Sequence, residues 1–223
     1  MNNETTLIDA PHGVLEVDAI WQKGYRQPTD TLALLCHPNP IDGGTMMNKV
    51  VSTMYRFCRD ANMDVVRFNY RGVGRSSGVS EYGDGEFMDA QTVLKWAMSR
   101  TNARVLWLGG FSFGGFIACR MADLLDEHQR TGGVFESLRL DNLALIAPSV
   151  VRNDASRLTI NAGHAFVIYG DNDGLVAPAL LHQFAVHRGF NQAIIAGAGH
   201  LFHGKLTDLK QALIQNTKPS KLY

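Results

Sequence analysis

A single serine flanked by glycines is the first residue in this chain with the setting for chemistry. Gly110, Ser112 and Gly114 form a GxSxG pattern inside GGFSFGG (109–115), between an apolar run at 104–108 and a helical pattern. At a strand-to-helix turn of this kind, a serine hydroxyl is held above the sheet as a nucleophile. Serine is also a frequent helix N-cap, which is the alternative role for Ser112.

A serine hydroxyl becomes a good nucleophile only when a base takes its proton and an acid orients that base. Asp171 and Asp173 follow the apolar run at 165–169, and His200 and His203 follow the run at 193–195. The order serine, aspartate, histidine is typical of one α/β architecture. We predict that His200 is the base, because Gly199 beside it leaves room for the imidazole, and that His203 has a solvated or loop-bracing role.

Acyl transfer also needs N–H donors for the negative oxygen of the tetrahedral intermediate. The amide of Phe113, directly after the serine, is the first candidate. The second is the amide of Asn39, because the flanking Pro38 and Pro40 have no amide hydrogen.

Other residues of these segments are expected to shape loops. We predict that His37 braces the Asn39 loop and that glycines 43 and 44 let its backbone fold back. NYRGVGRSSG (69–78) has neither GxxxxGK[ST] nor GxGxxG spacing, so nucleotide binding is not predicted. Arg71 and Arg75 in this segment are expected to brace the loop, with contact to an acidic substrate as the alternative.

Alternating strands and helices must position these residues. LIDAPHGVLEVDAIW (7–21) predicts an antiparallel hairpin at one sheet edge. Short apolar runs typical of strands buried on both faces lie at 31–36, 65–68, 104–108, 143–147, 165–169 and 193–195. Helical spacing lies at 47–61, 87–97, 112–129, 177–188 and 204–215, with longer irregular connections at 130–141 and 148–164. The order predicts a mostly parallel sheet of about eight strands with helices on both faces.

Composition limits the class of protein. The 223 residues are 45% hydrophobic, which predicts one domain over 1–223. Lys plus Arg and Asp plus Glu are equal at 21 each, so neither nucleic acid nor an anionic membrane is an expected partner. No apolar run reaches the length of a membrane span and no secretory signal is visible, so a cytoplasmic location is expected. The three cysteines are expected to be buried free thiols, and the scattered histidines predict no metal site; no cofactor is expected.

The chain resembles the α/β-hydrolase superfamily over nearly its whole length. It is most similar to a lidless bacterial branch marked by HPxPxxGGxMxNKVV, present here as HPNPIDGGTMMNKVV (37–51), and by RFNxRGVGxSxG, present as RFNYRGVGRSSG (67–78). GFSFG, GDxD and HxFHGKL match as well. The resemblance implies a serine esterase or thioesterase without a cap domain.

The resemblance also bears on single residues. The family acid stands three residues after the glycine that closes its strand, which implies Asp173 rather than Asp171. Asp171 is then expected to orient its own loop through backbone amides. The chain departs from the usual pattern at Asn39, Gly174, Gly199 and Leu201, which bears on the shape of the pocket.

An apolar pocket for the acyl group is expected near the serine, and its candidate lining residues are Met46, Phe111, Phe113, Leu175, Leu201 and Phe202. The leading hypothesis is a serine hydrolase that acts on a small carboxylic ester or thioester through Ser112, Asp173 and His200. Peptidase or lactonase activity would use the same residues. A catalytically silent fold used as a binding module is the alternative from another class.

Overall fold

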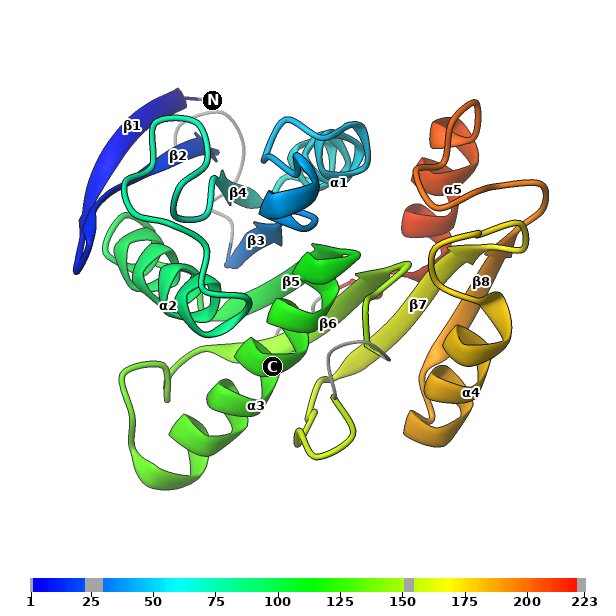
Figure 1. Ribbon diagram of the computed structural model, residues 1–223. Helices are drawn as coiled ribbons and strands as arrows, with labels where there is room; N and C mark the ends of the chain where they lie inside the picture. Colours follow the sequence, from blue (N-terminus) through cyan, green and yellow to red (C-terminus); the bar gives the residue numbers. More distant parts are fainter. Residues whose placement is uncertain (1, 23–29, 151–154, 220–223) are drawn as a thin grey trace.

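The computed structural model describes residues 2–22, 30–150 and 155–219, and its centre is an eight-stranded sheet (Figure 1). The strands lie in the order β1-β2-β4-β3-β5-β6-β7-β8. β2 pairs antiparallel with β1 and β4, and every other neighbouring pair is parallel. Their bounds are β1 (Asn2–Ala10), β2 (Gly13–Trp21), β3 (Thr31–Cys36), β4 (Asp64–Phe68), β5 (Val105–Phe111), β6 (Arg139–Ile146), β7 (His164–Gly170) and β8 (Asn191–Ile195).

Five α-helices cover the two faces of the sheet. In Figure 1, α1 and α5 lie on one face, and α2, α3 and α4 lie on the other. Their bounds are α1 (Lys49–Asp60), α2 (Asp84–Met98), α3 (Phe113–Thr131), α4 (Pro178–Arg188) and α5 (Leu206–Asn216). The prediction of a mostly parallel sheet of about eight strands with helices on both faces is therefore confirmed.

The predicted edge hairpin is β1 and β2, which pair from Asn2↔Trp21 to Ala10↔Gly13. On β2, the side chains of Leu15, Val17 and Ala19 are fully buried, whereas the residues that alternate with them are partly exposed. This alternation is what a strand with one face on the core requires.

The central strands are buried along their whole length. Every residue of β3, β4 and β5 is buried, and apart from Asp64 and Arg67 of β4 these strands carry no charged residue, as expected of strands covered on both faces. Trp107 of β5 is fully buried, and its ring lies 5.8 Å from that of Phe57 on α1. Burying a large apolar side chain of this kind stabilises the fold by about 1.5 to 3 kcal/mol.

Several elements begin or end away from the predicted positions. Helix α1 begins at Lys49 rather than at 47, because the Oδ1 atom of Asn48 accepts a hydrogen bond of 2.8 Å from Val50 N–H and caps the helix there. The predicted connection at 130–141 is shorter than expected, since β6 already begins at Arg139, which pairs with Val105. The connection at 148–164 includes residues 151–154, which lie outside the described residues.

All three cysteines are free and buried, as predicted. No helix in the described part of the chain combines the length and apolar character needed to cross a bilayer.

Candidate active site

Ser112 occupies the sharp turn between β5 and α3. Its backbone has φ 54° and ψ −117°, a left-handed conformation that is strained for a residue with a side chain. Its N–H donates to the carbonyl of Ile146 at 2.9 Å, and its own carbonyl accepts from Gly115 and Ser149 at 2.9 Å each. Ser112 stands at the N-cap position of α3, but its hydroxyl makes no capping hydrogen bond. The alternative role as an N-cap is therefore wrong.

The glycines on either side of this serine allow the backbone to approach its neighbours closely. A Cβ atom at position 110 would lie 2.1 Å from the carbonyl oxygen of Gly114, and one at position 114 would lie 2.2 Å from that of Cys36. Any side chain at these two positions would push α3 away from β3 and β5.

His200 connects the serine to a carboxylate. Its Nε2 atom lies 2.9 Å from Ser112 Oγ, and its Nδ1 atom lies 2.8 Å from Asp173 Oδ2. Because an ionised carboxylate only accepts hydrogen bonds, Nδ1 carries the proton in the neutral ring, which leaves Nε2 free to accept the serine proton. The structure thus brings together the three residues predicted to act as nucleophile, acid and base.

Asp173 is held in place by three hydrogen bonds. Besides His200, the N–H groups of Leu175 and Val176 donate to Asp173 Oδ1 at 2.8 and 2.9 Å. Burial raises the pKa of the Asp173 carboxyl, but these hydrogen bonds and the imidazole outweigh burial and leave the pKa below its usual value. Asp173 is therefore a carboxylate that orients the His200 ring.

Asp171 and His203 take other positions. Asp171 is exposed, and its Oδ1 atom accepts the N–H of Gly197 at 2.6 Å. This contact braces the loop that carries His200, whereas the prediction had Asp171 orient its own loop. His203 is exposed and does not line the cavity described below, so the structure places it among solvated residues.

The two residues predicted to supply oxyanion donors, Phe113 and Asn39, line the same cavity as Ser112. Among the described residues, neither Phe113 N–H nor Asn39 N–H has a hydrogen-bond acceptor. Both donors therefore remain available to a bound oxyanion.

The Asn39 loop is shaped by its neighbours. Gly43 has φ 77°, and the N–H of Gly44 donates to the carbonyl of Asn39 at 2.9 Å, so the loop folds back on itself as predicted. His37 is fully buried between two backbone groups: Nδ1 lies 2.6 Å from the carbonyl of Pro38, and Nε2 accepts from Tyr70 N–H at 3.1 Å. Burial lowers the pKa of His37 to about 3, so this ring is neutral and braces the loop.

Arg71 and Arg75 make ion pairs within the protein, which fits the bracing role predicted for them. Arg71 pairs with Asp89 at 2.9 Å and with Glu81, and Arg75 pairs with Glu16 at 2.9 Å.

A cavity of about 410 Å³ opens above the serine. It is lined by Asn39, Asp42, Tyr82, Ser112, Phe113, Ser149, Leu175, Val176, Ala177, Leu180 and His200. Of the predicted pocket residues, Phe113 and Leu175 are in this set. Among the residues that the structure describes, Met46, Phe111, Leu201 and Phe202 lie outside the lining, so the prediction for these four is wrong.

The physical reason for this correction is packing. Met46, Phe111 and Phe202 are buried in the protein interior, and Leu201 is 43% exposed away from the cavity. The Phe111 ring lies 5.2 Å from the His200 imidazole and 6.5 Å from the Phe202 ring, so it supports the imidazole.

Sequence reasoning missed six lining residues: Asp42, Tyr82, Ser149, Val176, Ala177 and Leu180. Val176 and Ala177 lie three and four positions after Asp173, and this proximity was a usable signal. Tyr82 and Ser149 lie on connections that leave the carboxyl ends of β4 and β6, where ligands of such sheets bind. Within the described residues, no cluster of His, Cys, Asp and Glu could hold a metal ion.

Comparison with known proteins identifies the family of this chain. The family model described as alpha/beta hydrolase fold matches residues 43–148. An uncharacterised protein of Rickettsia prowazekii is 32% identical over 198 residues, which cover 83% of this chain and 78% of the relative. Two solved α/β-hydrolase structures are each more than 30% identical to this chain along nearly its whole length. The chain belongs to the α/β-hydrolase fold family.

The first of these structures is an α/β serine hydrolase without a lid from Xanthomonas campestris, with 31% identity, a TM-score of 0.84 and coverage of 97% of both chains. The second is an α/β serine hydrolase homologue from Coxiella burnetii, with 32% identity, a TM-score of 0.82 and coverage of 98% of this chain and 99% of the other. Both structures therefore share the fold of this chain along nearly its whole length.

Proposed function

We propose that the protein is a serine hydrolase that cleaves small carboxylic esters or thioesters through an acyl-enzyme on Ser112. The observation that carries this proposal is the chain of two hydrogen bonds from Ser112 Oγ through His200 to Asp173. Placed beside unoccupied amide donors and an open cavity, this arrangement has every group that acyl transfer needs.

The reaction begins when Ser112 Oγ attacks the carbonyl carbon and its proton moves to His200 Nε2. The carbonyl oxygen becomes negative, and the N–H groups of Phe113 and Asn39 donate to it. Asp173 stabilises the imidazolium. The tetrahedral intermediate then collapses, the bond to the alcohol or thiol breaks, and His200 gives its proton to that leaving group.

Water completes the cycle. The oxygen of a water molecule attacks the acyl carbon while His200 takes a proton from that water. The second tetrahedral intermediate then releases the carboxylic acid. The proton on His200 returns to Ser112 Oγ, which restores the free enzyme.

A substrate panel tests this proposal. We expect the wild-type protein to hydrolyse nitrophenyl esters or acyl-CoA thioesters of increasing chain length, and we expect Ser112→Ala to hydrolyse none of them. Matching circular dichroism spectra of the two proteins would show that the variant is folded. Hydrolysis by Ser112→Ala at the wild-type rate would contradict the proposal.

A further inference from the structure

Tyr82 is an aromatic side chain held at the mouth of the cavity in an unusual backbone conformation. It lines the same cavity as Ser112, and the residue is 80% exposed. Its φ is 55°, in the left-handed region that bulky side chains rarely adopt. In the described part of the chain, five residues other than glycine have a positive φ. Two of them, Ser112 and Tyr82, line the cavity.

The backbone on both sides of Tyr82 is fixed by one buried carboxylate. Glu86 is fully buried, and it accepts the N–H of Glu81 at 3.2 Å and the N–H of Gly83 at 2.7 Å. The carbonyl of Gly83 accepts a further hydrogen bond of 2.9 Å from Arg120. Residues that precede and follow Tyr82 are therefore both tied to the body of the protein.

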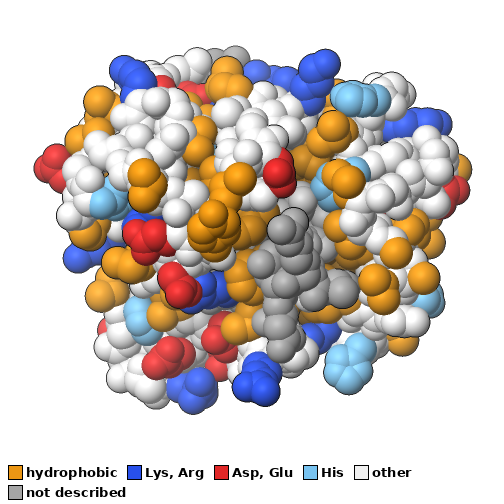
Figure 2. Space-filling model, viewed as in Figure 1, with side chains coloured by type: hydrophobic (Ala, Val, Ile, Leu, Met, Phe, Trp, Pro, Cys, Tyr) orange, Lys and Arg blue, Asp and Glu red, His pale blue; other side chains and the backbone are white. Residues whose placement is uncertain are grey.

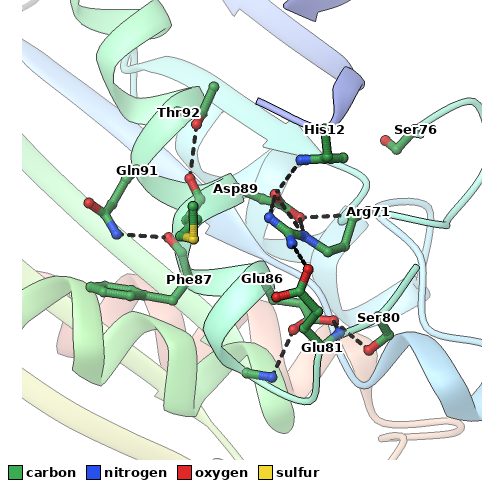
Figure 3. Close-up of polar contacts among 12 residues, drawn as sticks. His12, Arg71, Ser76, Ser80, Glu81, Glu86, Phe87, Asp89, Gln91 and Thr92 are labelled. Atoms are coloured by element: carbon green, nitrogen blue, oxygen red, sulfur yellow. Dashed lines mark hydrogen bonds and ion pairs between the residues drawn. The ribbon is translucent and has the colours of Figure 1, made fainter. Parts of the chain in front are cut away.

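A second set of contacts anchors the same segment (Figure 3). Glu81 pairs with Arg71, whose guanidinium also pairs with the buried Asp89 of α2 at 2.9 Å. The side chains of Arg71 and Asp89 are 5% and 1% exposed. Residues that the surrounding structure holds in a strained backbone conformation cluster at functional sites.

Apart from Phe113, the remaining apolar lining comes from the segment between β7 and α4 and from the first turn of α4. Leu175 is 76% exposed and Leu180 is 38% exposed, and both line the cavity with Tyr82. In Figure 1, the segment before α2 and the segment before α4 lie on opposite sides of the β5–α3 turn that carries Ser112. Figure 2 shows hydrophobic side chains at the surface in the middle of this face. A flat ring of a ligand bound in this cavity would bury its faces against these apolar side chains.

We propose that Tyr82 determines specificity by stacking on a planar aromatic ring of the substrate next to the scissile ester bond. This inference rests on the proposed hydrolase function. The rigid backbone of the Tyr82 segment presents its ring without further ordering when substrate binds, and rigid aromatic anchors of this kind bind at low cost in conformational entropy. The substrates would be aromatic esters rather than aliphatic ones of equal size.

Two pairs of esters matched in size test this inference. Benzyl acetate and cyclohexylmethyl acetate place the ring in the alcohol, whereas methyl phenylacetate and methyl cyclohexylacetate place it in the acid. For at least one pair, we expect the wild-type kcat/KM to favour the aromatic ester by roughly threefold to tenfold, the range of an aromatic ring pair. Tyr82→Phe should keep this ratio, and Tyr82→Leu should bring it close to one.

Val79→Ala is the matched control, since Val79 is 74% exposed in the same segment but lies outside the cavity lining. It should keep the wild-type ratio. The ratio of the two kcat/KM values does not depend on the fraction of folded protein. A loss of folded protein alone would therefore leave this ratio unchanged. The inference is overturned by a wild-type ratio near one for both pairs, or by an unchanged ratio in Tyr82→Leu. Fluorophosphonate labelling of Ser112 alongside either result would show that only the specificity inference has failed.

Discussion

The imidazole Nε2 atom of His200 lies 2.9 Å from the hydroxyl oxygen of Ser112, although the two residues are 88 positions apart in the sequence. The sheet brings them together, because β5 and β8 both run toward the same edge. If this contact moves a proton, His200→Ala should lower kcat for nitrophenyl acetate by about 10³-fold or more. His203→Ala is the control and should change kcat less than about twofold. The reverse result would assign the base to His203.

The two aspartates after β7 are expected to differ sharply. Asp173→Asn keeps the size of the side chain but removes the charge that orients His200, so kcat should fall by about 10³- to 10⁴-fold. Asp171→Asn affects only a hydrogen bond to Gly197 and should lower kcat less than about tenfold. Steady-state kinetics of the two variants would measure this difference, and a larger loss in Asp171→Asn would transfer the role of the acid.

The glycine at position 114 is required by the contact between α3 and β3. Alanine normally stabilises a helix relative to glycine, but here its Cβ would lie 2.2 Å from the carbonyl oxygen of Cys36. We expect Gly114→Ala to lower the free energy of unfolding by about 2 kcal/mol or more in urea. Gly174→Ala is the control near the same site, because no atom lies within 4 Å of its added Cβ. Equal stability of the two variants would contradict the packing described for this turn.

Burial of His37 predicts a dependence of stability on pH. Its pKa falls from 6.5 to about 3 in the folded protein, so between these pH values only the unfolded chain binds the proton. The free energy of unfolding should therefore fall as the pH is lowered through this window, by up to about 1.4 kcal/mol per pH unit. Above pH 6.5 the ring is neutral in both states, so stability does not depend on its titration. Below about pH 3 it is protonated in both states, and the loss of stability is complete.

Urea unfolding of the wild type and His37→Gln at pH 7, 6 and 5 measures this contribution. The wild type should lose more stability than the variant over this range, because the variant has no imidazole to protonate. Parallel losses in the two proteins would show that His37 is not the group responsible.

The fold and the reacting groups could be predicted because their signals are local. The apolar runs of β3 and β5 mark buried strands, and the glycines beside Ser112 mark the turn that follows one of them. Asp173 and His200 stand just beyond later strands, and parallel strands of one sheet end at one edge. Sequence spacing therefore placed Ser112, the two aspartates and His200 at one edge of the sheet, and the family resemblance selected Asp173 rather than Asp171.

The pocket walls could not be predicted in the same way, because they depend on the directions of side chains. Phe111 adjoins Ser112 and Phe202 is close to His200, yet both rings pack into the interior behind the imidazole. Tyr82, by contrast, reaches the cavity from a connection 30 positions before the serine. Its position depends on the hydrogen bonds to Glu86, which no sequence pattern revealed.

Labelling with a fluorophosphonate probe, followed by mass spectrometry of the intact protein and its peptides, tests the proposed nucleophile most directly. The account predicts one adduct per chain, located on Ser112, and no adduct in a folded Ser112→Ala variant. An adduct on another residue, or undiminished labelling of Ser112→Ala, would contradict it.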